Sequence, residues 1–108
     1  NEEIKNRINL SIDYIHENYN NNISLTELAN ISGLSRAHYV FTFKKITGLS
    51  PHQYLIKIKI EKAKDLIKFS NISLTDIAYN LGYPALSAFT RAFKKITGIS
   101  PSDFKDKR

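Results

Sequence analysis

The chain contains one nine-residue sequence twice. Residues 43–51 are FKKITGLSP and residues 93–101 are FKKITGISP, and the two copies differ only at Leu49 and Ile99. Glycine readily adopts the left-handed conformation that ends a helix, while Ser followed by Pro suits an N-cap and the first helical position. Each copy therefore combines a helix stop with a helix start. The repeat predicts two similar helical units within one chain of 108 residues.

The residues around each restart support this interpretation. In the first copy, we expect Gly48 to end one helix, and Ser50 with Gln53 to form a capping box for the next. In the second copy the equivalent glycine and serine are followed by Asp103, a weaker closing partner than Gln. Helix termination and helix capping do not explain the two lysines of each copy. We therefore expect these lysines to have a functional role.

Apolar residues elsewhere recur at spacings of three and four, which is typical of amphipathic helices. No stretch shows the period-two alternation of a half-buried strand. We therefore expect an all-α fold with about seven helices. Their expected ranges are 3–19, 24 to about 33, 35–47, 51–68, 73 to about 82, 86–97 and 100–105.

Two short helices joined by a tight turn that contains Gly match the helix-turn-helix pattern, and the chain shows it twice. Ser24 and Ser73 are 49 residues apart, whereas Phe43 and Phe93 are 50 apart, so one residue is inserted, most simply in the second turn around Pro84. We expect one domain, 1–108. It divides into a first helix-turn-helix unit at 1–50, a linker helix at 51–68 that bridges the units, and a second unit at 69–108.

Some details of packing are also expected. Ser24 and Glu27 have the spacing of a capping box. The helix at 35–47 is expected to place Tyr39, Thr42, Phe43 and Ile46 on one face, and the helix at 86–97 to bury Phe89, Ala92, Phe93 and Ile96.

The charge distribution points to a polyanionic partner. Residues 1–23 contain two basic and four acidic side chains, whereas residues 24–108 contain fourteen and six. Such a field attracts nucleic acid or an anionic membrane surface. Membrane attachment is disfavoured, because the basic residues lie on short helices rather than on one long amphipathic face.

Other classes of function find little support. The chain has no Cys, and its three histidines show no metal-ligand spacing, so no metal or other cofactor is expected. No nucleophile–base set, glycine-rich phosphate loop or informative carboxylate pair indicates an enzyme. No apolar run approaches the length of a membrane span, and a cytoplasmic location is expected. The chain opens on Asn1 and contains no Met, which suggests an excised domain or a processed chain from which a partner domain is missing.

The segment 82–101, GYPALSAFTRAFKKITGISP, resembles the DNA-binding domain of the AraC/XylS family of bacterial transcription regulators. The linker also resembles that family, although Lys59 stands where Arg is more usual. The resemblance implies that helices 35–47 and 86–97 are recognition helices that enter two successive major grooves of double-stranded DNA. A linker helix of about 18 residues is roughly 27 Å long, which suits the ~34 Å of one DNA turn. Tandem units predict an asymmetric site.

The outward positions of these helices are the candidates for base contacts. They are Arg36, Ala37, Val40 and Phe41 in the first unit, and Ser87, Thr90 and Arg91 in the second. Arg91 is the strongest, because a guanidinium fits guanine O6 and N7. Ser87 either contacts DNA or stabilises the start of its helix. Phe41 stands where the family usually has Arg or another polar residue. This leaves three interpretations: T-rich or weak recognition, anchoring mainly on phosphates, or docking of a missing domain.

Phosphate contacts are expected from Lys44, Lys45, Lys94 and Lys95, and from free amides at the N-termini that begin with Ser24 and Ser73. Lysines near helix C-termini also interact favourably with the helix dipole, and the serines are first of all caps. RNA polymerase is a further possible partner. The alternative function is a helical protein-interaction module with the same fold and degenerate base contacts in the first unit.

Overall fold

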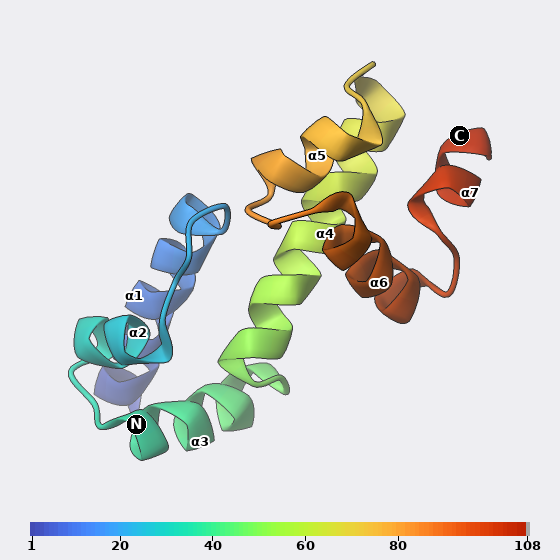
Figure 1. Ribbon diagram of the computed structural model, residues 1–108. Coiled ribbons are helices and arrows are strands. Elements are labelled where there is room, and N and C mark those ends of the chain that lie inside the picture. Colours follow the sequence, from blue (N-terminus) through green and yellow to red (C-terminus); the bar gives the residue numbers. More distant parts are fainter. Residues whose placement is uncertain (108) are drawn as a thin grey trace. The chain divides into compact units, whose positions relative to one another are not determined.

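The computed structural model describes residues 1–107, and within that range it contains seven α-helices and no strand (Figure 1). The helices are α1 (Glu2–Asn18), α2 (Leu25–Ser32), α3 (Arg36–Thr47), α4 (Pro51–Phe69), α5 (Leu74–Asn80), α6 (Leu86–Thr97) and α7 (Pro101–Asp106). The all-α expectation is confirmed. Helices α2 and α3 form one helix-turn-helix pair, and α5 and α6 form the second.

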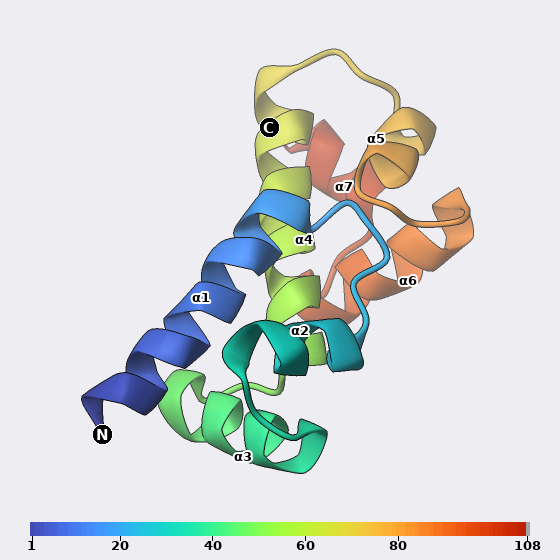
Figure 2. The same cartoon turned by 90° about the vertical axis from the view of Figure 1, so that its left-hand side faces the viewer.

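The chain divides into two compact units, which we call unit 1 (Asn1–Leu55) and unit 2 (from Ile56 onward). The division falls inside α4, which is one continuous helix of 19 residues. Unit 1 therefore contains α1, α2, α3 and the first turn of α4. Unit 2 contains the rest of α4 with α5, α6 and α7 (Figure 2).

In unit 1, helices α1, α2 and α3 pack against one another around an apolar core. Ile8 and Ile15 of α1 and Tyr39 and Phe43 of α3 have no exposed surface, and Leu28 of α2 is buried beside them. The α1 residues recur at the helical spacing that the sequence predicts. Burying each side chain of this size stabilises the fold by roughly 1.5–3 kcal/mol.

The core of unit 1 also contains a short polar chain. The Tyr39 hydroxyl donates a hydrogen bond to Ser11 Oγ at 2.9 Å, and Ser11 Oγ donates to the Ile8 carbonyl at 2.7 Å. Buried hydroxyls need partners of this kind, because an unpaired one loses its bonds to water. The Tyr39–Ser11 bond thereby joins α3 to α1.

The two units share one aromatic arrangement. In unit 1 the ring of Phe43 lies 5.6 Å from Tyr39 and 5.4 Å from Tyr54, measured between centroids. In unit 2, Phe93 lies 5.7 Å from Phe89 and 5.5 Å from Phe104. All three positions are related by the 50-residue offset, so the repeat extends from the sequence into the core.

The second core differs from the first at the turn before α6. Tyr83 lies 5.7 Å from Phe89, and its hydroxyl is buried with no hydrogen-bond partner among the described residues. Lys59 Nζ lies 4.8 Å from the centroid of the Tyr83 ring. Burial raises the pKa of the Tyr83 hydroxyl and lowers the pKa of the Lys59 ammonium group.

The repeated sequence ends α3 and α6 as predicted. Gly48 and Gly98 adopt φ values of 84° and 87°, and each donates its backbone N–H to the carbonyl four residues earlier. The threonine that precedes each glycine adds a clamp. Thr47 Oγ1 lies 2.9 Å from the carbonyl oxygens of Phe43 and Leu49 and accepts a hydrogen bond from the Leu49 N–H at 3.2 Å. Thr97 repeats this geometry.

One of the two expected capping boxes forms. Ser50 and Gln53 exchange hydrogen bonds of 3.0 and 3.2 Å at the start of α4. At the start of α2, Ser24 accepts from the Glu27 N–H at 3.0 Å, but the Glu27 carboxylate accepts from the Tyr14 hydroxyl instead of closing the box. The prediction was wrong there because Tyr14 of α1, distant in sequence, takes that oxygen.

The inserted residue lies in the turn of the second helix-turn-helix, as expected. Gly33 and Gly82 both have positive φ and are 49 residues apart, whereas the N-caps Ser35 and Ala85 are 50 apart. The extra residue therefore falls after Tyr83 and before Ala85, which places it at Pro84.

The expected buried faces of α3 and α6 need correction at their C-terminal ends. Ile46 and Ile96 are 40% and 51% exposed, and Ala92 is half-buried. Each isoleucine lies in the last turn of its helix, three residues after the buried Phe43 or Phe93. Helical spacing predicts which face of a helix is buried, but it does not predict how far along the helix that burial extends.

Candidate nucleic-acid interface

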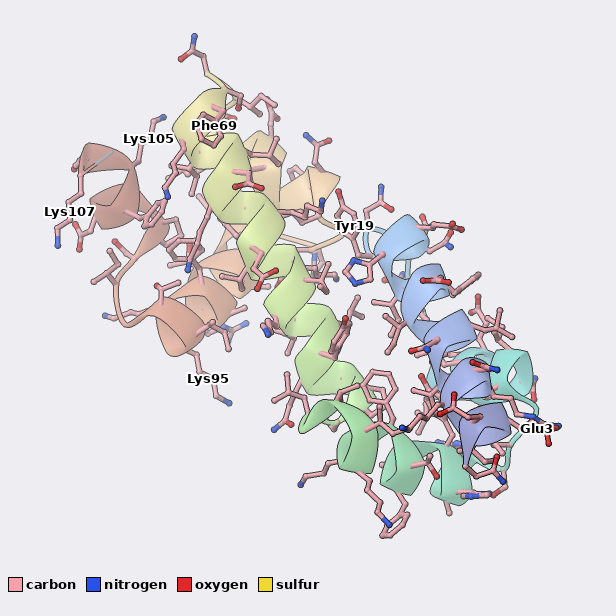
Figure 3. The ribbon with its side chains drawn as sticks, turned by 180° about the vertical axis from the view of Figure 1, so that it is seen from behind. Glu3, Tyr19, Phe69, Lys95, Lys105 and Lys107 are labelled. Atoms are coloured by element: carbon pink, nitrogen blue, oxygen red, sulfur yellow. The ribbon has the colours of Figure 1, made fainter. Side chains whose placement is uncertain are left out.

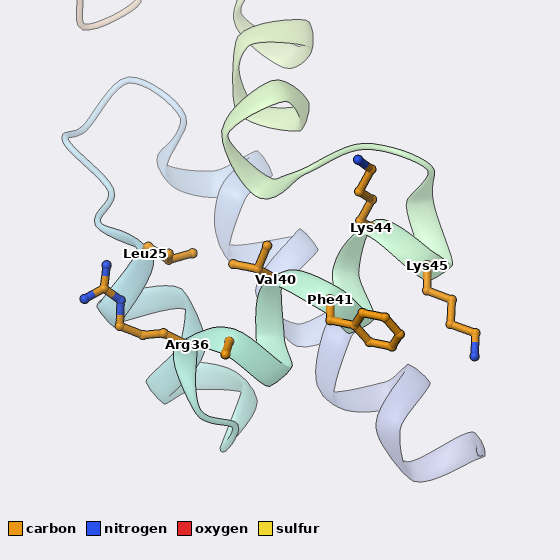
Figure 4. A pocket seen from close by; sticks show the side chains of 7 residues that line it. Leu25, Arg36, Val40, Phe41, Lys44 and Lys45 are labelled. Atoms are coloured by element: carbon orange, nitrogen blue, oxygen red, sulfur yellow. The ribbon is translucent and has the colours of Figure 1, made fainter.

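The outer face of α3 combines apolar and basic side chains. Arg36, Ala37 and Phe41 are exposed and Val40 is half-buried. Together with Lys44, Lys45 and Leu25 of α2 they line one open hollow of about 830 Å³ (Figure 4). The structure thus brings all the expected base-contacting residues of unit 1 to one surface.

Leu25 is the member of this surface that the sequence analysis missed. It follows the N-cap Ser24 and points toward Val40 across the helix-turn-helix (Figure 4). The sequence could have indicated its place, because a residue directly after a capping serine lies in the first turn of the helix that follows. The apolar floor of the hollow therefore comes from both helices.

Phe41 is an exposed aromatic side chain on this surface. Its exposed fraction is 67%, which is unusual for a large apolar side chain. Lys45 Nζ lies 5.9 Å from the centroid of its ring. This contact lies at the outer limit of a cation–π interaction, so the ring remains open on its other side.

The outer face of α6 is polar. Ser87 and Arg91 are exposed and Thr90 is half-buried, while Phe89 and Phe93 on the opposite face have no exposed surface. The N-cap of α6 is Ala85, and no side chain caps this helix. Ser87 therefore does not cap α6, and its hydroxyl is directed to the exposed face.

The lysine pairs of the repeat extend from the last turns of the two helices. Lys44 and Lys45 end α3, and Lys94 and Lys95 end α6. All four are exposed, and Figure 3 shows Lys95 pointing away from α6. Within residues 1–107 the four lysines take part in no ion pair, and the two ion pairs found there, Lys5–Glu2 and Arg7–Glu3, both lie on α1. Their ammonium groups are available to an external anion.

The two outer faces match position by position. The 50-residue offset pairs Ala37 with Ser87, Val40 with Thr90, Phe41 with Arg91, and each lysine with a lysine. The members of each pair have the same burial class. Unit 1 thus presents an apolar version of the polar surface that unit 2 presents, on the same backbone.

The net charge lies in one of the units. Unit 1 contains five basic and five acidic side chains, whereas the chain from Ile56 onward contains eleven and five, which accounts for the whole net charge of +6. Four of the five acids of unit 1 lie on α1. Its basic surface is therefore confined to α3 and the first half of α1.

Ser24 and Ser73 act as caps. Their side chains accept hydrogen bonds from the N–H groups of Glu27 and Asp76, at 3.0 and 3.1 Å. Each helix thus has a carboxylate in its first turn. These carboxylates already interact with the positive end of the helix dipole, where a phosphate would bind.

Among residues 1–107, no helix is long and apolar enough to cross a membrane. The same part of the chain contains no group of three or more His, Cys, Asp or Glu side chains placed to hold a metal ion.

A family model described as a helix-turn-helix domain matches residues 28–107. The chain belongs to the AraC/XylS type of helix-turn-helix domain. This match begins within α2 and includes α3, the whole of α4 and the second helix-turn-helix pair. It favours a DNA-binding domain over the protein-interaction module.

Known proteins of this AraC/XylS type share both sequence and fold with the chain. The raffinose operon transcriptional regulatory protein RafR of Pediococcus pentosaceus is 34% identical over 92% of the chain. The C-terminal domain of AraT, a response regulator from Geobacillus stearothermophilus, superposes with a TM-score of 0.90 at 27% identity. The match covers 94% of this chain and 85% of that one.

A third similar protein was solved with DNA. The DNA-binding domain of AdpA, a global transcriptional factor, in complex with a target DNA, has a TM-score of 0.88 at 23% identity, over 93% of this chain and 90% of that one. At that identity the likeness shows the fold alone. The chain spans 36% of the length of RafR, so it corresponds to one part of such a regulator.

Proposed function

We propose that this domain binds double-stranded DNA in a sequence-specific manner as part of a bacterial transcription regulator. The observation that carries the proposal is the outer face of α6, where Ser87, Thr90 and Arg91 lie opposite the buried Phe89 and Phe93. A helix that is anchored by one face and presents hydrogen-bonding side chains on the other suits insertion into a major groove. The complex of the AdpA domain with its target DNA supports the same use of the fold.

Arg91 has the central role in this proposal. Its exposed guanidinium can donate two hydrogen bonds to O6 and N7 of a guanine. Ser87 lies one helical turn before Arg91, and Thr90 lies one residue before it. In this proposal both contact the neighbouring bases. In unit 1, Arg36, Ala37, Val40 and Phe41 face the bases of the second groove.

Phosphate contacts come from the lysine pairs that end α3 and α6. Their exposure and their lack of ion pairs support this role, because an ammonium group without a partner in the protein binds a phosphate at little cost. The amides at the starts of α2 and α5, behind Ser24 and Ser73, remain part of the proposal with weaker support. The carboxylates of Glu27 and Asp76 oppose an anion there.

The two helix-turn-helix pairs occur in tandem along the chain, so we propose an asymmetric DNA site that covers two successive major grooves. Helix α4 connects them without a break, and its 19 residues extend for roughly 28 Å at 1.5 Å per residue. That length is compatible with one turn of DNA, which is ~34 Å.

The regulator as a whole needs more than this domain. We propose that an effector-binding or dimerisation segment belongs to the same protein, since RafR is nearly three times as long as the matched part. RNA polymerase is a proposed partner, and the bacterial cytoplasm the proposed location. The proposed activity is binding, with no catalytic step.

Selection of bound sequences from a random pool of duplexes tests the proposal. We expect one asymmetric consensus to emerge, and Arg91→Ala to weaken binding to it by about 1–3 kcal/mol while relaxing specificity at one guanine. Ser102→Ala, which changes an exposed residue of α7, is the matched control and should bind like the parent. Failure to enrich any sequence, with Arg91→Ala binding like the parent, would refute sequence-specific binding.

A further inference from the structure

We propose that unit 1 recognises the 5-methyl groups of thymine through the apolar surface of Ala37, Val40 and Phe41, at a T-rich half of the site. This inference rests on the proposed function, because it assumes that α3 enters a major groove. It assigns to unit 1 a base preference different from that of unit 2.

The first support is the composition of the surface. The side chains of Ala37, Val40 and Phe41 have no hydrogen-bond donor or acceptor, and Leu25 extends the same apolar area. The thymine methyl is the apolar group that a base pair presents in the major groove. A recognition helix with these side chains therefore gains binding energy from thymine and gains none from the polar edges of the other bases.

The second support is the internal comparison. Ala and Ser, Val and Thr, and Phe and Arg stand at equivalent positions of α3 and α6 with equal burial. The first two pairs have nearly the same size and differ by one hydroxyl group. At these three positions unit 1 keeps the shape of a DNA-contacting face but lacks its hydrogen-bonding groups, so any selectivity of these positions has to come from apolar contacts.

The third support is the charge around the hollow, which decides what kind of partner fits it. Arg36, Lys44 and Lys45 border the apolar residues, and Lys45 Nζ lies 5.9 Å from the Phe41 ring centroid. An apolar segment of a protein would have to leave these cations unpaired or bring acidic residues to each. Duplex DNA supplies phosphates at the edges of the groove and methyl groups at its floor, which matches the arrangement.

Replacing single thymines by deoxyuridine in the selected duplex tests the inference, since this change removes only the methyl group. The half of the site bound by unit 2 is found first, by replacing single guanines with 7-deazaguanine. The guanine contacted by Arg91 is the one at which this replacement weakens DNA binding by the parent domain but not by Arg91→Ala. We expect deoxyuridine in the other half to weaken binding about fourfold for each contacted methyl, corresponding to one buried methylene equivalent.

The side chains are tested by a double-mutant cycle. Phe41→Ala should lose the sensitivity to deoxyuridine in the unit 1 half while keeping the sensitivity to 7-deazaguanine in the unit 2 half. Phe41→Arg should shift the preferred base at that position from thymine toward guanine, because it recreates the residue of unit 2 at the equivalent position. Asn9→Ala, an exposed change on α1 away from the hollow, is the control.

The outcomes separate this inference from the proposed function. A selected site with no thymine in the unit 1 half, or one whose binding is insensitive to deoxyuridine there, overturns the inference while sequence-specific binding stands. Equal loss from deoxyuridine in the parent and in Phe41→Ala also overturns it. Absence of any selected sequence refutes the proposed function itself.

Discussion

The Tyr39 hydroxyl donates a hydrogen bond of 2.9 Å to Ser11 Oγ, and both side chains are fully buried. The bond joins α3, the proposed recognition helix of unit 1, to α1. The equivalent position in unit 2 is Phe89, which packs in the same aromatic arrangement without a hydroxyl. The recognition helix of unit 1 is thus held by one directional bond that unit 2 does not have.

This bond predicts an asymmetry between two substitutions. Tyr39→Phe should lower the free energy of unfolding by about 1 kcal/mol, because Ser11 still donates to the Ile8 carbonyl. Ser11→Ala should cost more, about 1–3 kcal/mol, because it leaves the buried Tyr39 hydroxyl without its acceptor. Urea unfolding of both variants and of the double variant measures the difference. Equal costs that add in the double variant would contradict the account.

Removing the Tyr83 hydroxyl should not destabilise the domain, in contrast to removing the Tyr39 hydroxyl. The Tyr83 hydroxyl is buried and has no hydrogen-bond partner among the described residues. Tyr83→Phe keeps the ring against Phe89 and removes the unpaired group, so the midpoint of thermal unfolding should stay the same or rise. Tyr39→Phe is the matched control, since it makes the same chemical change where the hydroxyl is paired. A clear fall in the midpoint for Tyr83→Phe would show that the hydroxyl is stabilising.

Lys59 should make stability depend on pH. Burial lowers the pKa of its ammonium group below the ordinary 10.5, so at pH values between the folded and unfolded pKa the unfolded chain binds more protons. The contribution of Lys59 to stability therefore rises as the pH approaches 10.5, and it falls as the pH drops through the folded pKa. Burial raises the pKa of Tyr83, which acts in the opposite direction above pH 10.

The two effects can be separated in a Tyr83→Phe background. There, we expect the free energy of unfolding of the Lys59 protein to rise relative to that of Lys59→Met between pH 8 and pH 10.5. Chemical denaturation at several pH values measures this difference. A difference that stays constant across the interval would mean that the Lys59 ammonium group is as well solvated in the folded domain as in the unfolded chain.

The lysine pairs predict a change in the salt dependence of DNA binding. Replacing Lys44 and Lys45 together by Ala should reduce the slope of log affinity against log salt concentration by about 2, since each lost phosphate contact lowers it by about 1. The same change at Lys94 and Lys95 should have an equal effect. Lys68→Ala, on α4, where Lys68 Nζ lies 5.6 Å from the centroid of the Phe104 ring, is the control and should leave the slope unchanged. An unchanged slope in both double variants would exclude phosphate contacts by these lysines.

Much of the fold could be predicted from local sequence. Gly48, Gly98 and the serine that follows each have conformational preferences that depend on their own backbones, so the helix boundaries followed from short-range rules. The internal repeat placed the two helix-turn-helix pairs, and the offset of 49 and then 50 residues located the insertion at Pro84. These features need no knowledge of which helices pack together.

The wrong or missing predictions concern residues whose contacts depend on parts of the chain that are distant in sequence. The capping box at Ser24 stays half-formed because Tyr14 donates to the Glu27 carboxylate. Ile46 and Ile96 are exposed although helical spacing places them with the buried residues of their helices. Leu25 joins the hollow of α3 through tertiary packing. The candidate base-contacting residues were found from the repeat and the outward face, and their roles stay predictions.

The most direct measurement of the central claim is an equilibrium titration of the domain with its selected duplex and with a shuffled duplex of the same composition. The account predicts that the selected duplex binds much more tightly at physiological salt, and that Arg91→Ala removes a large part of this preference while binding to the shuffled duplex changes little. Equal affinity for the two duplexes, unaffected by Arg91→Ala, would contradict it.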